Sequence, residues 1–117
     1  MTELILIRHG ETDMNRELRF QGQVDPPLNA VGLEQARRLG QRLAGAMAHG
    51  LYVSDLLRTR ETAAPIASTL ALAGVPDPAL REQAFGAVDG LTAADIQTRW
   101  PEAWSRWTAF DPLFAMP

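Results

Sequence analysis

Apolar positions in the first half of the chain alternate between continuous runs and helical spacing. Residues 4–7 form an unbroken apolar run, the pattern of a strand buried on both faces of a parallel sheet. Asn29 precedes apolar positions spaced three and four residues apart, which predicts an amphipathic helix that ends at Gly50. A second apolar run at residues 51–53 predicts another short strand. This order of elements is typical of an α/β fold with a parallel sheet.

The second half of the chain continues with further helical stretches and more proline. Residues 54–55 are expected to cap a helix that contains Pro65, where we expect a kink or a late helix start. Residues 75–80 include two prolines and are expected to form an edge strand or an extended connection. Residues 92–95 resemble a capping box, and Pro101 stands where a further helix begins. No repeat or linker is visible, so residues 1–117 are interpreted as a single domain.

A polar, turn-rich loop separates the first predicted strand from the first predicted helix, and loops of this length are usually functional. Ligands in open α/β sheets bind beyond the carboxyl ends of the strands. Arg8 and His9 directly follow the first predicted strand, and Arg58 lies near the start of the helix after the second. If the strands are neighbours, both guanidinium groups converge beside the imidazole. Such a group of residues favours a phosphoryl site in which histidine attacks phosphorus.

The remaining candidate residues have competing interpretations. The reaction needs an acid for the leaving oxygen, and Glu82 ends the next extended segment, although a solvated surface charge is the alternative. Arg58 on its own is equally compatible with a helix surface. His49 is expected at a helix terminus, where the helix dipole favours it, rather than in the site. Glu11 is expected to bond loop amides rather than to act as a base.

Composition excludes several classes of protein. The chain has 117 residues, 11 basic residues against 14 acidic ones and no cysteine. These values predict one small globular domain in the cytoplasm, without a disulfide scaffold or a cysteine-ligated metal. They provide neither a basic surface for nucleic acid nor an apolar run long enough for a membrane. Every basic residue is arginine, which suits oxyanion recognition but is also what a GC-rich genome would give.

An ordered set of motifs resembles the histidine phosphatase superfamily, the phosphoglycerate mutase-like proteins. The resemblance covers residues 4–90 and continues more weakly to the end of the chain. The matching segments are Arg8-His9-Gly10-Glu11-Thr12, Asn15, Gln21-Gly22, Asp25 with Pro27-Leu28-Asn29, Gly32 with Gln35-Ala36, Ser54-Asp55-Leu56 with Arg58 and Thr62-Ala63, and Glu82 with Phe85-Gly86 and Asp89-Gly90. The resemblance implies a three-layer α/β/α fold with a mostly parallel sheet.

The same resemblance implies a function and a set of site residues. The catalytic residues it implies are Arg8, His9, Arg58 and Glu82, and the substrate-binding residues are Asn15, Gln21 and Gly22. By this resemblance His9 becomes a phosphohistidine, the two arginines bind phosphoryl oxygens, and Glu82 serves as proton donor and then as base for water. The expected activity is hydrolysis of a small phosphorylated metabolite, with no metal and no cofactor.

One departure from the family pattern leaves two alternatives open. Family members carry a second histidine, in a His-Gly step after a later strand, and they are longer than this chain. We therefore expect a fold truncated at the C-terminus, with either reduced stability or compensation by homodimer formation. The alternative functions are a phosphoglycerate mutase-type phosphotransferase and a catalytically impaired phosphate-binding domain.

Overall fold

The computed structural model describes residues 1–115 and residue 117. In chain order the elements are α1 (Asp13–Arg16), α2 (Ala30–Arg42), β1 (Leu51–Val53), α3 (Leu57–Leu70), β2 (Gly74–Pro76), the 3-10 helices η1 (Pro78–Leu80) and η2 (Gly86–Val88), α4 (Ala93–Arg99) and α5 (Pro101–Thr108). The radius of gyration is 16.6 Å, whereas a compact chain of this length has about 13 Å. The molecule is therefore elongated.

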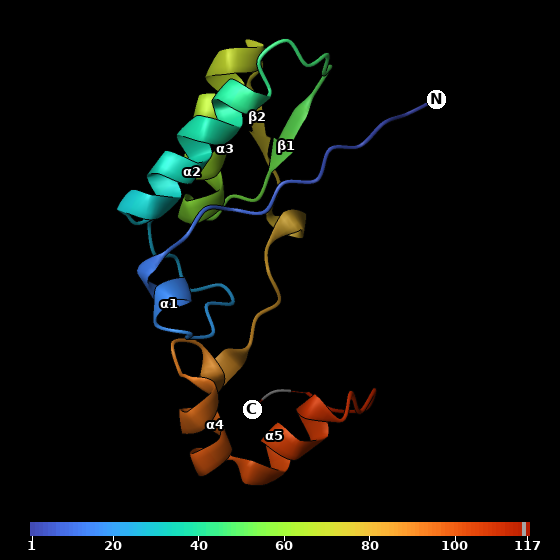
Figure 1. The fold of residues 1–117 in the computed structure, drawn as a ribbon. Coiled ribbons are helices and arrows are strands. Elements are labelled where there is room, and N and C mark those ends of the chain that lie inside the picture. Colours follow the sequence, from blue (N-terminus) through green and yellow to red (C-terminus); the bar gives the residue numbers. More distant parts are fainter. Residues whose placement is uncertain (116) are drawn as a thin grey trace.

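The upper part of the molecule in Figure 1 is a small α/β unit. Strands β1 and β2 are parallel, with Tyr52 opposite Val75. Helix α3 contacts both strands, and α2 packs along α3. A Cβ on Gly40 of α2 would lie 3.0 Å from the Pro65 carbonyl oxygen of α3, so glycine allows the two helices to approach closely. The α/β class is thus confirmed, and the described residues show one helical layer on a two-stranded sheet.

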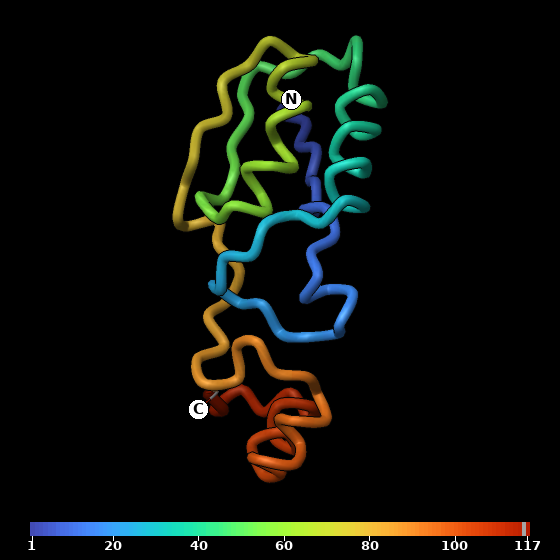
Figure 2. The backbone as a smooth tube through the Cα atoms, turned by 90° about the vertical axis from the view of Figure 1, so that its left-hand side faces the viewer, coloured from blue at the N-terminus to red at the C-terminus, as the bar shows by residue number. Residues whose placement is uncertain are grey.

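Helices α4 and α5 lie at the opposite end of the molecule (Figure 2). They follow a segment that pairs with the N-terminal loop, because the Phe20 N–H donates to the Leu91 carbonyl at 2.9 Å and Gly90 N–H to the Phe20 carbonyl at 2.7 Å. The Phe20 ring also meets the Trp107 ring edge to face, with centroids 5.1 Å apart. The C-terminal helices are therefore attached through the loop that follows His9.

Several predicted elements are confirmed. Asn29 caps α2 by accepting a hydrogen bond from Gly32 N–H at 2.9 Å. The strand at residues 51–53 forms, and of the extended segment predicted at residues 75–80 the first two residues belong to the strand Gly74–Pro76, whereas Pro78–Leu80 form a 3-10 helix. The capping box at residues 92–95 is present, with both reciprocal bonds, and Pro101 is the first residue of α5. These signals are local in sequence and could be interpreted without tertiary context.

The predicted strand at residues 4–7 is wrong, because this segment is extended but has no strand partner among the described residues. Leu4 and Leu6 are 79% and 91% exposed. An apolar run favours a buried strand, but a strand also requires a neighbouring backbone with which it exchanges hydrogen bonds. Composition alone cannot supply that neighbour.

Two predicted helix boundaries are also wrong. Helix α2 ends at Arg42 rather than at Gly50, and Gly45 beyond it has a left-handed φ of +83°. Met47, which continues the apolar spacing, is 88% exposed. Helix α3 begins at Leu57 and runs through Pro65, so the late start is wrong. The fixed φ of proline is helical, and the chain loses only one backbone hydrogen bond there.

The predicted cap of α3 is wrong, because the N-cap residue is Leu56 and it makes no side-chain cap hydrogen bond. Ser54 Oγ accepts a hydrogen bond at 3.3 Å from the N–H of Leu56, which precedes the first turn of the helix. Asp55 instead forms a two-pronged ion pair with Arg81, at 2.6 and 2.7 Å. The Leu57 N–H donates to Asp25 Oδ1 at 2.6 Å. The carboxylate that stabilises this helix end therefore comes from the N-terminal loop.

Candidate functional site

His9 lies where the N-terminal segment enters the loop before α1, and its side chain is half-buried. Its Nδ1 lies 2.7 Å from the carbonyl oxygen of Gly10. A carbonyl oxygen only accepts hydrogen bonds, so Nδ1 carries the proton in the neutral ring. The lone pair of the neutral imidazole is consequently on Nε2, so this is the ring nitrogen with the electron pair that a nucleophile requires.

The surroundings of His9 keep the imidazole neutral. Burial lowers the pKa of His9 below its ordinary 6.5, and the charges of Arg58 and Arg8 lower it further. The hydrogen bond to the Gly10 carbonyl and the negative charge of Glu82 partly offset this decrease in pKa. The charges of Arg8, Arg58 and Glu82 thus all influence the pKa of His9. A neutral imidazole near pH 7 is the form required for nucleophilic attack.

Thr62 of α3 supports the backbone beside His9. Its buried Oγ1 accepts a hydrogen bond from Gly10 N–H at 2.9 Å and donates to the Arg58 carbonyl at 2.7 Å. Gly10 also packs closely against α2, because a Cβ added to Gly10 would lie 3.0 Å from the Cα of Gly32. The histidine is therefore fixed between the two main helices by a hydroxyl group and a close contact between two glycines.

Arg58 in the first turns of α3 is 2% exposed. Its Nη1 donates to the Val24 carbonyl at 2.8 Å and its Nη2 to the Gly22 carbonyl at 2.7 Å. Burial lowers the pKa of Arg58, although the ordinary value is so high that the group stays charged. Each Nη has a second N–H, so the guanidinium can hold the loop and still donate to an oxyanion.

Arg8 and Glu82 are exposed, unlike Arg58. Glu82 follows η1, and its Oε1 accepts a hydrogen bond from the Gln83 N–H at 2.8 Å. Its carbonyl oxygen accepts a hydrogen bond from the Gln23 side chain at 3.2 Å. The segment with the predicted proton donor is thereby tied to the loop that holds Arg58.

Asn15 and Gln21 meet at a buried hydroxyl group. Thr12 is completely buried, and its Oγ1 lies 2.6 Å from Gln21 Oε1 and 3.1 Å from Asn15 Oδ1. Thr12 also caps α1 by accepting from Asn15 N–H at 3.1 Å. The side-chain oxygens of both predicted substrate-binding residues are thus engaged with Thr12, which positions their amide groups in the loop.

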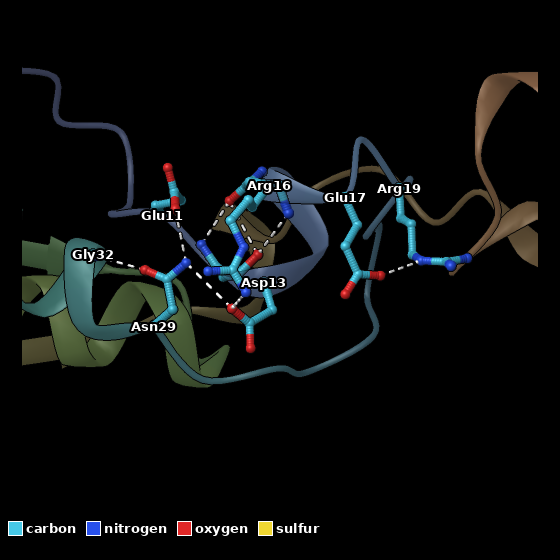
Figure 3. A network of polar contacts seen from close by, with 9 residues as sticks. Glu11, Asp13, Arg16, Glu17, Arg19, Asn29 and Gly32 are labelled. Atoms are coloured by element: carbon cyan, nitrogen blue, oxygen red, sulfur yellow. Dashed lines mark hydrogen bonds and ion pairs between the residues drawn. The ribbon is translucent and has the colours of Figure 1, made fainter.

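A polar network fixes the loop against the N-terminus of α2 (Figure 3). The Asn29 carboxamide lies between two carboxylates and donates to Glu11 Oε1 at 2.8 Å and to Asp13 Oδ1 at 3.4 Å. The Glu11 N–H donates to the Gln35 side chain at 2.9 Å. Glu11 therefore has the structural role expected for it, although its partner is a side-chain amide rather than a loop backbone amide.

Gly22 is the predicted substrate-binding residue with the most restricted surroundings. It has φ +49°, in the left-handed region, and is buried. An added Cβ would collide with the carboxyl group of Asp89, whose Cγ would be 2.9 Å away. Its carbonyl oxygen is also the acceptor for Arg58 Nη2. The backbone conformation here, rather than a side chain, determines where the loop lies.

The second histidine of the chain lies outside this group of residues. His49 is exposed, in the loop between α2 and β1, rather than at a helix terminus as expected. The 13 residues of α2 separate this loop from the end of the helix near Gly10, a length of about 20 Å. His49 is therefore too distant to contact a phosphoryl group at His9.

Sequence reasoning assigned no role to Thr62, Thr12 and Asp89. Thr62 and Asp89 occur in the motif segments, but their spacing from His9 gives no indication of the contacts they make. Thr12 and Asn15 form a capping box in which asparagine stands three residues after the N-cap, where glutamate or glutamine is usual. The contact between the Asp89 carboxylate and Gly22 can be identified only from the structure.

Comparisons with known proteins agree with this arrangement. The family model described as the Histidine phosphatase superfamily (branch 1) matches residues 4–117. The chain therefore belongs to the histidine phosphatase superfamily. It is 39% identical over 106 residues to a Proteus mirabilis protein named "Probable phosphoglycerate mutase GpmB". It is 40% identical over 107 residues to the metal-independent phosphoserine phosphatase of Arabidopsis thaliana.

A solved structure shows the same fold. The mycobacterial glucosyl-3-phosphoglycerate phosphatase, in a structure described as a complex with VO3, superposes with a TM-score of 0.80 and 36% identity. The match covers 86% of this chain and 48% of the mycobacterial chain. The Proteus and Arabidopsis matches cover 91% and 90% of this chain, and 49% and 45% of those proteins. The chain thus spans about half the length of the relatives it matches.

Proposed function

We propose that this chain carries the nucleophilic and phosphoryl-binding part of a phosphomonoester hydrolase that acts on small phosphorylated metabolites. The observation that carries the proposal is the position of His9, with Nδ1 bonded to Gly10 and the charges of Arg8, Arg58 and Glu82 acting on its ring. The phosphatase names of two relatives support hydrolysis as the reaction. Neither name identifies the substrate of this chain.

The geometry supports a two-step reaction. His9 Nε2 attacks the phosphorus atom, forming a P–N bond as the P–O bond to the alcohol breaks. Arg8 and Arg58 neutralise the charge on the phosphoryl oxygens, and Glu82 donates its proton to the departing oxygen. Water then attacks the phosphohistidine while Glu82 accepts a proton from it, so that phosphate leaves and His9 is regenerated. Every group in these steps belongs to the chain itself.

Two alternative functions predict results that differ from hydrolysis. One relative is named as a phosphoglycerate mutase, which favours phosphoryl transfer to a second alcohol instead of water. The second alternative is a domain that binds phosphate without turnover. It is favoured because the site contains one histidine among the described residues, since His49 is distant. Transfer would appear as isomerised phosphoglycerate that depends on a bisphosphorylated glycerate. Binding alone would appear as saturable phosphate affinity without product.

The test is hydrolysis of 4-nitrophenyl phosphate by this chain, after treatment with a chelator. His9→Ala is the test variant, and His49→Ala is the matched control because it removes the other histidine. The proposal expects turnover that His9→Ala abolishes and His49→Ala retains. Folded protein with no turnover, or turnover that survives His9→Ala, would overturn it.

A further inference from the structure

Asp89 and Gly22 are in direct contact across two paired segments. Asp89 follows η2, and its carboxyl group occupies the space in which a Cβ of Gly22 would lie, since Cγ and Oδ2 would be 2.9 and 3.0 Å from that atom. The segments are joined by the backbone hydrogen bonds between Gly90, Leu91 and Phe20 described above. The absence of a side chain at Gly22 therefore allows a carboxylate to lie directly on the loop backbone.

Two charged side chains converge on this loop with incomplete hydrogen bonding. Among the buried side-chain nitrogen and oxygen atoms of the described residues, Arg58 Nε and Asp89 Oδ1 are the two without a hydrogen-bond partner. Arg58 Nη2 donates to the carbonyl of the same Gly22 on which Asp89 lies. Their charges are opposite and act on each other's ionisation. A buried charge is costly unless another charge or dipole compensates it.

We propose that Asp89 is a positioning residue for Arg58. Its carboxylate lies on Gly22, whose carbonyl oxygen accepts a hydrogen bond from Arg58, and so fixes the loop at residues 22–24. The carbonyl oxygens of that loop accept both Nη hydrogen bonds of Arg58. Asp89 thereby sets the orientation of the guanidinium group without touching the phosphoryl group. The role of Arg58 toward phosphate rests on the proposed function, whereas its contacts with the loop do not.

The charge of Asp89 can be separated from its shape. Asparagine has nearly the same shape as aspartate but no charge, so Asp89→Asn retains the packing on Gly22 and removes the attraction to Arg58. Asp111→Asn is a matched control. Asp111 follows α5, and its carboxylate forms an ion pair with Arg106 of that helix rather than with a residue of this loop. Both variants change the net charge by the same amount.

The first measurement follows Arg58 itself. Exchange of the Arg58 Nε–H with solvent is measured by ¹⁵N NMR in the unmodified chain and in both variants. We expect Asp89→Asn to accelerate this exchange about tenfold, since couplings through a shared backbone segment have that size, and Asp111→Asn to leave it unchanged. Unchanged exchange in Asp89→Asn would overturn the proposal whether or not the chain binds phosphate.

The second measurement distinguishes positioning from general stabilisation. The affinity for inorganic phosphate is measured with and without Asp89→Asn, first in the otherwise unmodified chain and then in an Arg58→Gln background. If Asp89 acts through Arg58, Asp89→Asn weakens phosphate binding about tenfold in the otherwise unmodified chain and has no effect in the Arg58→Gln background. Equal weakening in both backgrounds would assign Asp89 a merely structural role. If the unmodified chain binds no phosphate but its Arg58 exchange responds, the proposed function fails and the positioning role stands.

A double-mutant cycle tests the contact between Gly22 and Asp89 directly. Gly22→Ala is expected to displace the carboxylate and accelerate Arg58 Nε–H exchange. In an Asp89→Ala background the added methyl group meets no carboxylate, so the further effect should be small. The backbone strain at Gly22 is the same in both backgrounds and cancels in the comparison. Fully additive effects would contradict contact between Asp89 and Gly22 as the means of positioning.

Discussion

The Nδ1 atom of His9 lies 2.7 Å from the carbonyl oxygen of Gly10, the next residue in the chain. This short-range bond determines which ring nitrogen carries the proton and which carries the lone pair. Gly10 is held in turn by the Thr62 hydroxyl of α3 through its N–H. The ring nitrogen of His9 that carries the lone pair is therefore determined by a backbone carbonyl, and that backbone is held by one helix.

The first prediction concerns the pKa of His9. Replacing Arg8 with glutamine should raise the pKa of His9 because a nearby positive charge is removed, and Glu82→Gln should lower it because a negative charge is removed. NMR titration of the imidazole in the two variants measures both changes. Shifts in the same direction would contradict the placement of the two charges beside the ring.

The depressed pKa of His9 also sets the sign of a stability change with pH. Well above pH 6.5 the imidazole is neutral in both the folded and the unfolded chain, so this group contributes no pH dependence there. As the pH falls below 6.5, the unfolded chain binds the proton first, and the free energy of unfolding decreases until the folded pKa is passed. His9→Gln should remove this part of the pH dependence in urea unfolding measured between pH 7 and pH 5.

The second prediction concerns the Thr62 hydroxyl. Thr62→Val leaves the buried Gly10 N–H without an acceptor, which should lower the free energy of unfolding by about 1–3 kcal/mol. Thr98→Val is the matched control, because Thr98 is exposed and donates only to the carbonyl of Ala94 at 2.8 Å, four residues earlier in its helix. Chemical denaturation of both variants provides the comparison. Equal losses would show that the Thr62 hydroxyl does not support Gly10.

The third prediction concerns the contact between the loop and α2. A Cβ on Gly32 would stand 2.8 Å from the backbone nitrogen of Glu11 and closer still to its carbonyl oxygen. Because both are backbone atoms, Gly32→Ala should cost about 3 kcal/mol or more through overpacking. At Gly45, where φ is +83° and no atom lies near, alanine should cost only the left-handed strain of about 1–2 kcal/mol. Thermal unfolding of both variants measures the difference, and a smaller loss at Gly32 would contradict the close packing.

The parts of the fold that could be predicted from sequence depend on neighbours along the chain. Asn29 caps its own helix, and the capping box at residues 92–95 closes within one turn. The strand at residues 4–7 was wrong because apolar composition does not specify a pairing partner. Asp25 caps a helix 32 residues away, a contact that no local pattern encodes.

The candidate site shows the same division. Arg8, His9, Arg58 and Glu82 could be proposed from strand ends and motifs, and the charges of the other three residues influence the pKa of His9. Their catalytic roles remain predictions. The contacts that position them, such as the Arg58 bonds to carbonyls 34 and 36 residues away, depend on tertiary packing. Sequence therefore indicated the chemistry, whereas the supporting contacts required the fold.

The central claim is that Nε2 of His9 accepts the phosphoryl group. The most direct measurement is rapid quenching of the chain with a phosphate-ester substrate in alkali, followed by ³¹P NMR and peptide mapping of the phosphorylated residue. We expect an acid-labile phosphoryl group on His9, bonded through Nε2, which is absent from His9→Ala. Phosphorylation through Nδ1, phosphorylation at another residue, or hydrolysis with no phosphorylated protein would contradict the account.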